Sequence, residues 1–248
     1  MFDFRIMLAE VPVRIRCAHR ETAAFFRPYL SEAEERFTVE PTEADLLRMR
    51  RDLIRAAEKE GRANAAFSDA FLERDAIHAL LAEGLVDHGV LLMHGSALCM
   101  DGQAYLFTAP SGTGKSTHAR LWREAFGERV WMINDDKPML RITPEGVTVW
   151  GTPWDGKHRL SRNAGAPLKA VAELKRDADN HIEPMTKADA FLLLRRQAYS
   201  SADPAVAARI LALENRLLDA AEFYTLGCNM EPEAALAAWK GMNPDIPH

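Results

Sequence analysis

The first residues of the chain alternate between apolar and charged positions. Over residues 4–17 this alternation has the two-residue period of a half-buried strand or hairpin, and a short apolar cluster follows at residues 21–29. Phe37 to Val39 form another short apolar segment, which stops before Pro41. The start of the chain is therefore expected to form a small sheet.

Two segments after Pro41 have the helical period instead. Apolar residues recur at helical spacing over residues 42–60, behind Thr42 as an N-cap, and again over residues 66–86. The run of cations from Arg48 to Arg51 is typical of a solvated helix face rather than of a binding patch. These helices and the preceding strands predict a small α+β module over residues 1–87.

From Gly89 the pattern changes to short, nearly continuous apolar runs, which are typical of buried strands. Residues 90–100 and 103–109 flank the turn Asp101-Gly102 and predict a hairpin. Further strands are expected over residues 129–133, 139–150 (with a turn at 144–146) and 223–228, and helices over 187–198, 204–221 and 232–241. This mixture predicts an α/β domain over residues 88–248, with a mixed sheet flanked by helices.

Composition and charge narrow the class of protein. The chain has 248 residues, of which 48% are hydrophobic and 27% charged, so it has the composition of a folded globular protein. Its net charge of −5 excludes a global basic field that would attract nucleic acid or an anionic membrane. The first residues lack the apolar centre of a signal peptide, and no apolar run approaches the roughly 20 residues of a membrane helix. The three cysteines are odd in number and far apart, which favours a reduced, cytoplasmic protein.

A glycine-rich segment follows the second strand of the hairpin and precedes an amphipathic helix. The residues expected to bind the nucleotide are Ser111, Gly112, Thr113, Gly114, Lys115, Ser116 and Thr117. Glycines let backbone N–H groups converge on phosphate oxygens, Lys115 neutralises the outer phosphates, and the Ser116 hydroxyl is a ligand for magnesium. Ala109 occupies the first glycine position of the G-x-x-x-x-G-K-[ST] pattern. The structural alternative is a glycine-rich turn before a capped helix, but pattern and context together favour a phosphate loop.

Residues 129–136 are expected to form an apolar strand that ends in two adjacent carboxylates. Asp135 and Asp136 are expected to point to opposite sides, so that one holds magnesium with Ser116 while the other accepts the proton of an attacking hydroxyl. His94, at the end of another apolar run, matters if it reaches Asp135, where a cationic imidazole would tune that carboxylate. His118 has the weaker claim and is expected to be a surface residue.

A guanine-specific switch protein is disfavoured. Thr186-Lys187-Ala188-Asp189 matches an N/T-K-x-D element by letters, but the preceding residues 181–184 are not expected to form a strand. Thr186 is better explained as the N-cap of the helix that follows. A D-x-x-G element is also absent from the position where it would be needed.

Three segments in order resemble the bacterial HPr kinase/phosphorylase family: Met93-His94-Gly95, the loop at residues 111–116, and Asn134-Asp135-Asp136. That family shares its nucleotide-binding core with ATP-dependent phosphoenolpyruvate carboxykinases. The resemblance, close over about residues 88–160, implies ATP, Mg²⁺ and phosphorylation of a serine hydroxyl. It also implies that Asp135 is the general base with His94 as its companion, that Lys115 binds phosphate, and that Ser116 and Asp136 are the magnesium ligands.

The chain departs from that family after the acidic strand. The E-I-R-G-x-G signature is replaced by residues 150–159, and the glutamate that assists magnesium has no equivalent unless Asp155 substitutes for it. Gly151 and Gly156 are expected to fix a tight loop here. From that loop, Lys157 and Arg159 are expected to contribute catalytic cations beside the γ-phosphate or an anionic acceptor.

The sequence therefore predicts an ATP-dependent kinase that transfers the γ-phosphoryl group to a hydroxyl of a protein, a peptide or a small metabolite. The amino-terminal module is a candidate for holding this acceptor, and the resemblance suggests a homo-oligomer. Two alternatives stay open: a carboxykinase-like enzyme, and a simple ATPase or non-catalytic module in which nucleotide regulates partner binding.

Overall fold

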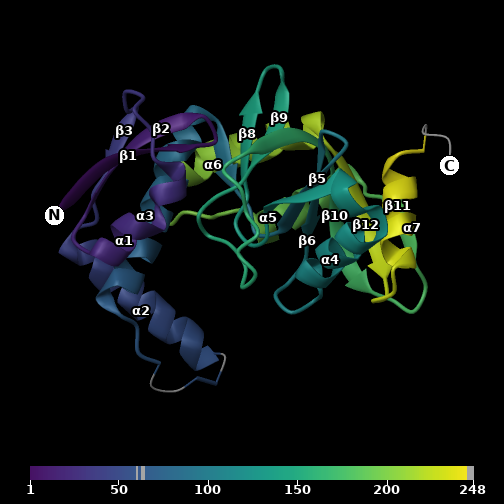
Figure 1. The fold of residues 1–248 in the computed structure, drawn as a ribbon, viewed down its shortest axis with the longest axis horizontal. Helices are drawn as coiled ribbons and strands as arrows, with labels where there is room; N and C mark the ends of the chain where they lie inside the picture. The colour runs from purple at the N-terminus through teal and green to yellow at the C-terminus, as the bar shows by residue number, and fades with distance from the viewer. Residues whose placement is uncertain (60, 63–64, 245–248) are drawn as a thin grey trace. The chain divides into compact units, whose positions relative to one another are not determined.

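A computed structural model describes residues 1–59, 61–62 and 65–244, so the predicted helix end at residue 60 and the last four residues lie outside the described residues. The chain forms two compact units, Met1–His88 and Gly89–His248 (Figure 1). Within the described residues, no helix is long and apolar enough to cross a membrane.

The first unit contains the predicted small sheet. Strands β1 (Phe2–Leu8) and β2 (Val11–Cys17) form an antiparallel hairpin, and β3 (Phe37–Val39) pairs with β2 in parallel. The alternation in the sequence arises because one face of the sheet is buried: the side chains of Ile6, Val13 and Ile15 lie on that face.

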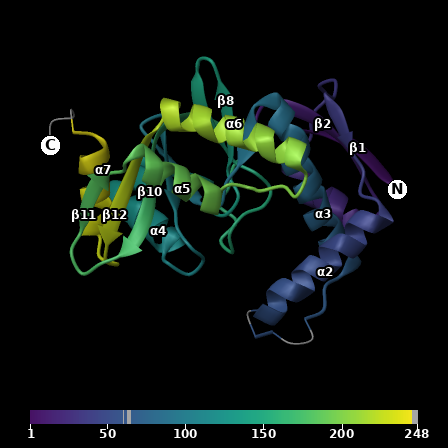
Figure 2. The same cartoon turned by 180° about the vertical axis from the view of Figure 1, so that it is seen from behind.

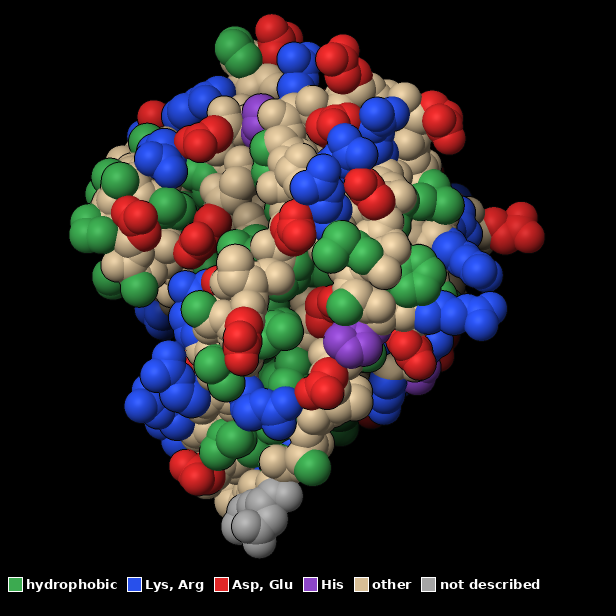
Figure 3. Space-filling view, turned by 90° about the vertical axis from the view of Figure 1, so that its left-hand side faces the viewer, with side chains coloured by type: hydrophobic (Ala, Val, Ile, Leu, Met, Phe, Trp, Pro, Cys, Tyr) green, Lys and Arg blue, Asp and Glu red, His purple; other side chains and the backbone are tan. Residues whose placement is uncertain are grey.

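Helices complete this unit. They are α1 (Arg20–Phe25), α2 (Glu43–Lys59) and α3 (Asp69–Gly84), with 3₁₀ turns at Arg27–Tyr29 and Leu85–His88. The Thr42 cap is confirmed: its hydroxyl accepts the Asp45 backbone N–H, while the Asp45 carboxylate accepts the Thr42 N–H. Lys and Arg side chains are interspersed with Asp and Glu on the face drawn in Figure 3, as expected for solvated charge.

The second unit is built on a nine-stranded mixed sheet with the order β4-β8-β9-β10-β6-β5-β7. Two further strands lie off this path: β12 pairs in parallel with β10, and β11 pairs antiparallel with β12. The strands are β4 (Val90–Leu92), β5 (Ser96–Met100), β6 (Gln103–Thr108), β7 (Val130–Asn134), β8 (Met139–Thr143), β9 (Gly146–Trp150), β10 (Gly165–Arg176), β11 (His181–Pro184) and β12 (Glu222–Cys228). The predicted hairpin is present as β5–β6, and Asp101 and Gly102 have the positive φ values of a tight hairpin turn. Its first arm is shorter than predicted, because residues 90–92 form the separate strand β4, which pairs with β8.

Two strands differ from the sequence prediction. The twelve-residue β10 was not expected, yet it pairs with β6, β9 and β12 and lies within the sheet. The expectation that residues 181–184 are no strand is wrong, because they form the short β11 against β12. Thr186 nevertheless caps the next helix as predicted, since its side chain accepts the Asp189 backbone N–H.

Helices cover both faces of this sheet (Figures 1 and 2). On one face α4 (Lys115–Phe126) and α7 (Glu233–Met242) pack into an apolar cluster that includes Trp122, Phe107 and Leu226. On the other face lie α5 (Lys187–Gln197) and α6 (Pro204–Ala220). The predicted mixed sheet flanked by helices is therefore present.

The topology brings several chain segments to one edge of the sheet. Strand β5 is antiparallel to both β6 and β7, so β6 and β7 run in the same direction, and β10 is parallel to β6. The carboxyl ends of β6, β7 and β10 consequently meet at the edge where β5 begins. Functional groups that follow these strands are expected to lie together there.

Candidate functional site at the sheet edge

The loop after β6 has the backbone conformation that its glycines permit. Gly112 and Gly114 have φ values of 78° and 128°, which a side chain would strain. The Thr113 hydroxyl donates to the Pro110 carbonyl at 2.8 Å, and α4 begins directly afterwards at Lys115. Ala109, at the position of the absent first glycine, is fully buried, so it belongs to the core rather than to the mouth of the loop.

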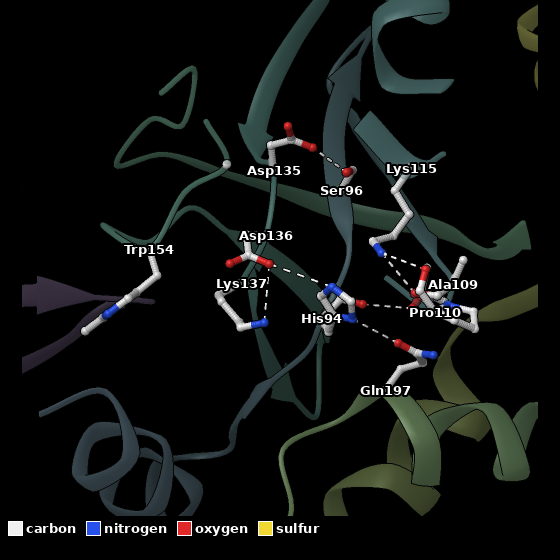
Figure 4. Close-up of polar contacts among 12 residues, drawn as sticks. His94, Ser96, Ala109, Pro110, Lys115, Asp135, Asp136, Lys137, Trp154 and Gln197 are labelled. Carbon is white, nitrogen blue, oxygen red and sulfur yellow. Dashed lines mark hydrogen bonds and ion pairs between the residues drawn. The ribbon is translucent and has the colours of Figure 1, made fainter. Parts of the chain in front are cut away.

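Among the predicted nucleotide-binding residues, Ser111 and Ser116 are exposed and Thr117 is partly buried. Lys115 folds back over the loop, where its Nζ donates to the Ala109 carbonyl at 2.9 Å and contacts that of Pro110 at 3.4 Å (Figure 4). Partial burial lowers the pKa of this amine; Asp136 opposes that shift and the neighbouring Lys137 adds to it. The amine is thus within electrostatic range of the turn that carries Asp135 and Asp136 (the acid turn).

Arg176, at the end of β10, also holds this loop. Its Nη2 donates to the Gly112 carbonyl at 2.6 Å and its Nε to the Thr113 carbonyl at 3.2 Å. The sequence pattern does not indicate Arg176, because it does not indicate strand β10.

Asn134 shapes the turn that carries the two carboxylates. Its side chain is fully buried, and its Oδ1 accepts the backbone N–H groups of Asp136 at 2.9 Å and Lys137 at 2.7 Å. Its Nδ2 donates to the carbonyls of Thr152 and Trp154 at 3.1 and 3.2 Å. One amide therefore fixes the acid turn against the segment that follows β9.

Asp135 points toward the start of β5. Its Oδ1 accepts a hydrogen bond from the Ser96 hydroxyl, a contact that the sequence did not indicate. The Asp135 backbone N–H donates to Asp155 Oδ1 at 3.2 Å. Gly156 lies directly against this group, because a Cβ there would come within 2.8 Å of Asp135 Oδ2.

Asp155 organises the loop. Its carboxylate also accepts the backbone N–H groups of Gly156 and Ser161, both at 2.8 Å. The residue that the sequence offered as a substitute for a magnesium-assisting glutamate is therefore engaged in holding backbone.

Asp136 points away from Asp135 and lies beside His94 and Lys137 (Figure 4). His94 Nε2 is 3.8 Å from Asp136 Oδ1, and Lys137 Nζ is 3.3 Å from the same oxygen. The expected pairing of His94 with Asp135 is thus wrong, because β5 presents Ser96, two residues later, to Asp135 instead.

His94 is held in place by Gln197 at the end of α5. Its Nδ1 is 3.2 Å from Gln197 Oε1, and its backbone N–H donates to the Gln197 carbonyl at 2.8 Å. Burial lowers the pKa of His94, and the positive charges of Lys137 and Lys115 lower it further. The imidazole is therefore biased toward its neutral form, although Asp136 acts in the opposite direction.

The loop after β9 is tight, as predicted. A Cβ on Gly151 would lie 1.9 Å from the Arg162 carbonyl oxygen, so only glycine fits. The side chains of Lys157 and Arg159 are exposed, and among the described residues neither makes a hydrogen bond or ion pair with the phosphate loop or the acid turn. The cation that accompanies the carboxylates is Lys137.

Magnesium fits the chemistry of two groups near this edge. The ion prefers oxygen ligands, and one or two carboxylates with substrate phosphates usually suffice to bind it. Ser116 and Asp136 supply a hydroxyl and a partly exposed carboxylate. A group of three or more His, Cys, Asp or Glu side chains that could hold a metal ion is not found within the described ranges.

His118 differs from its prediction as a surface residue. It is only 2% exposed, and its Nε2 accepts the Trp122 indole N–H at 3.0 Å. Burial lowers the pKa of His118 to about 3, so it is a neutral core residue on the buried face of α4.

No family model and no curated protein matches the chain. Among solved structures it is similar to the HPr(Ser) kinase/phosphatase from Coxiella burnetii, with 10% identity and a TM-score of 0.34. That similarity covers 62% of this chain and 95% of the other. A likeness at this level does not assign a function, which has to come from the side chains at the sheet edge.

Proposed function

We propose that the protein is an ATP-dependent phosphotransferase that phosphorylates a hydroxyl group. The observation that carries the proposal is the meeting of a glycine-rich loop with a lysine and a divided pair of carboxylates at one sheet edge. Lys115 lies within electrostatic range of both Asp136 and Asp135. This combination suits phosphoryl transfer, because its catalysis consists mainly of positioning and charge stabilisation.

In this proposal the loop holds the phosphates. The backbone N–H groups of residues 111–116 and the Lys115 amine bind the β- and γ-phosphate oxygens. Lys115 gives up its contacts with the Ala109 and Pro110 carbonyls when the stronger phosphate acceptors arrive. Ser116 and Asp136 would hold Mg²⁺, which would supply positive charge against the phosphates.

Asp135 is the proposed general base. The acceptor O–H bond breaks, its proton goes to Asp135, and the acceptor oxygen forms a bond to the γ-phosphorus. The bond between that phosphorus and the bridging oxygen breaks, and ADP leaves. Ser96 fixes one carboxylate oxygen, which orients the group.

Lys137 is the further cation that the geometry supports. It lies beside Asp136, whereas Lys157 and Arg159 are exposed on the loop after β9. A fixed positive charge next to the transferring group stabilises it without reorganisation during the reaction. The acceptor is expected to carry a serine or threonine hydroxyl.

The proposal is tested by incubating the purified protein with γ-labelled ATP, Mg²⁺ and peptide or protein fractions of the source cell, followed by mass spectrometry. The wild type should label a serine or threonine in one acceptor. Lys115→Met should lose ATP affinity and labelling. Lys169→Met is the matched control, because Lys169 lies earlier on β10 and pairs with Glu222.

The alternatives give different results in the same experiment. ATP hydrolysis without a labelled acceptor would identify an ATPase. ATP binding with neither hydrolysis nor labelling would identify a nucleotide-regulated binding module. Either result would overturn the kinase proposal.

A further inference from the structure

A hollow of about 530 Å³ opens beside the glycine-rich loop. Its volume falls in the range of small-molecule sites. Its walls are the loop residues Pro110, Ser111, Gly112 and Thr113, and the end of β10 from Glu173 to Arg176. Asp135, Asp136 and Lys115 do not line it, so the proposed proton transfer does not use this hollow.

The hollow and the acid turn lie on opposite sides of the loop. On one side of β6 the sheet continues to β5 and β7, which leads into Asp135 and Asp136. On the other side it continues to β10, whose end forms the wall of the hollow. A triphosphate bound in the loop with its γ-phosphate toward Asp135 must therefore leave the loop on the β10 side.

We propose that this hollow holds the nucleoside of the triphosphate and that Arg176 covers the nucleobase. The inference rests on the proposed function, and it adds the orientation of the nucleotide and a residue that determines its affinity. The walls expose more apolar than polar surface, which suits the flat face of a heteroaromatic base, and Lys175 and Arg176 in the same walls suit a phosphorylated ligand better than a lipid.

Arg176 is suited to this contact because the loop already holds its guanidinium. Two of its nitrogen atoms donate to the Gly112 and Thr113 carbonyls, at 2.6 and 3.2 Å. A guanidinium fixed along its edge presents a flat face on which an aromatic ring stacks. Arg176 then both contacts the base and holds the loop in its conformation.

The same contacts prepare the loop for anions. In the proposed complex, each carbonyl that faces Arg176 points away from the bound phosphates. In a trans peptide, the N–H points opposite to the carbonyl. The N–H of Gly114, in the peptide unit of the Thr113 carbonyl, thus faces away from Arg176. Arg176 is a positioning residue for the loop as well as a contact for the base.

The charges around the hollow also favour a nucleotide. Glu173 is the acidic residue in its wall, is only 9% exposed, and is paired with Arg196 at 3.1 Å and Lys175 at 3.7 Å. Its negative charge is thereby compensated. Lys175 and Arg176 leave a positive balance beside the path of the α-phosphate.

Titration calorimetry with ATP·Mg and with tripolyphosphate·Mg separates the two roles of Arg176. The wild type should bind ATP at least tenfold more tightly than tripolyphosphate. Arg176→Lys keeps a cation for the loop carbonyls but lacks the planar face, so it should weaken ATP about tenfold and change tripolyphosphate less than twofold. Equal weakening of both ligands would show a role in the loop alone and overturn the nucleoside assignment.

Arg129→Lys is the matched control, since Arg129 also lies over aromatic rings but pairs with Asp101 in the β5–β6 turn. It should leave both affinities unchanged. Photolabelling with azido-ATP then locates the base: label removed by excess ATP should map to residues 110–113 or 173–176. Competable label elsewhere would overturn this inference and leave the proposed function intact. A wild type that binds neither ATP nor tripolyphosphate would overturn both.

Discussion

The Ser96 hydroxyl donates a hydrogen bond to the Asp135 carboxylate across strands β5 and β7. Ser96 is 1% exposed, so its hydroxyl is held in one place at the first position of β5. This contact leaves the second carboxylate oxygen, Oδ2, to receive the proton of an acceptor. The proposed base is thus oriented by a residue that is distant in sequence.

Ser96→Ala should lower the rate of phosphoryl transfer about tenfold or more at saturating ATP. A hydrogen bond to a charged group contributes about 1.5–3 kcal/mol, and each 1.4 kcal/mol of barrier corresponds to a factor of ten. ATP affinity should stay within twofold, because the Ser96 hydroxyl is engaged with Asp135. Steady-state kinetics with Ser31→Ala as the control measure both values. A raised KM for ATP with an unchanged kcat would contradict this role.

Gly156→Ala should damage the site more than the fold. The added methyl group would lie 2.8 Å from Asp135 Oδ2 and 2.9 Å from the Asp135 carbonyl oxygen, so the base has to move. We expect at least a tenfold loss of transfer. Gly102→Ala is the opposite control: its φ of 81° should cost about 1 kcal/mol of stability, in a turn at the far end of β5 and β6. Equal effects of the two variants on transfer would argue against the placement of Gly156.

Local patterns in the sequence were sufficient for the loop and for both carboxylates. Each belongs to one strand and the turn after it, so neighbouring residues determine its conformation. The partners of the carboxylates depend on the pairing of β5 with β7, which has a register shift between Ala97 and Leu98. That shift is invisible in the sequence, and His94 was consequently assigned to the wrong aspartate.

The prediction also failed where tertiary contacts determine the structure. Strand β10 contains Pro167 and several alanines and lysines, which have low strand propensity, but its pairing with β6 and β12 overrides that preference. Strand β11 is a four-residue edge strand that ends at Pro184. Because β10 was missed, Arg176 was missed with it.

His118 should make the folded state sensitive to acid. Its pKa is lowered from 6.5 to about 3 by burial, so the unfolded chain binds a proton more readily below pH 6.5. Its contribution to stability is therefore complete above pH 6.5 and is lost as the pH falls toward 3, about 2 kcal/mol of it by pH 5. Urea unfolding at pH 7 and pH 5 should show this loss, and His118→Gln should reduce it. An equal pH dependence in wild type and variant would contradict the assignment.

Lys137→Met should raise the pKa of His94. Lys137 is, after burial, the strongest influence that lowers this pKa, and removal of its positive charge favours the protonated imidazole. An NMR titration of the His94 ring protons measures the shift, with Lys169→Met as the control. An unchanged or lower pKa in Lys137→Met would show that the two side chains do not interact in solution.

In the proposed reaction, Asp135 accepts the proton of the hydroxyl that is phosphorylated. The most direct measurement is the rate of transfer from labelled ATP by Asp135→Asn, compared with wild type and with Asp101→Asn, whose carboxylate pairs with Arg129 in the β5–β6 turn. We expect a loss of at least a hundredfold for Asp135→Asn with ATP affinity retained, and near-wild-type transfer for Asp101→Asn. Transfer by Asp135→Asn at the wild-type rate would contradict it.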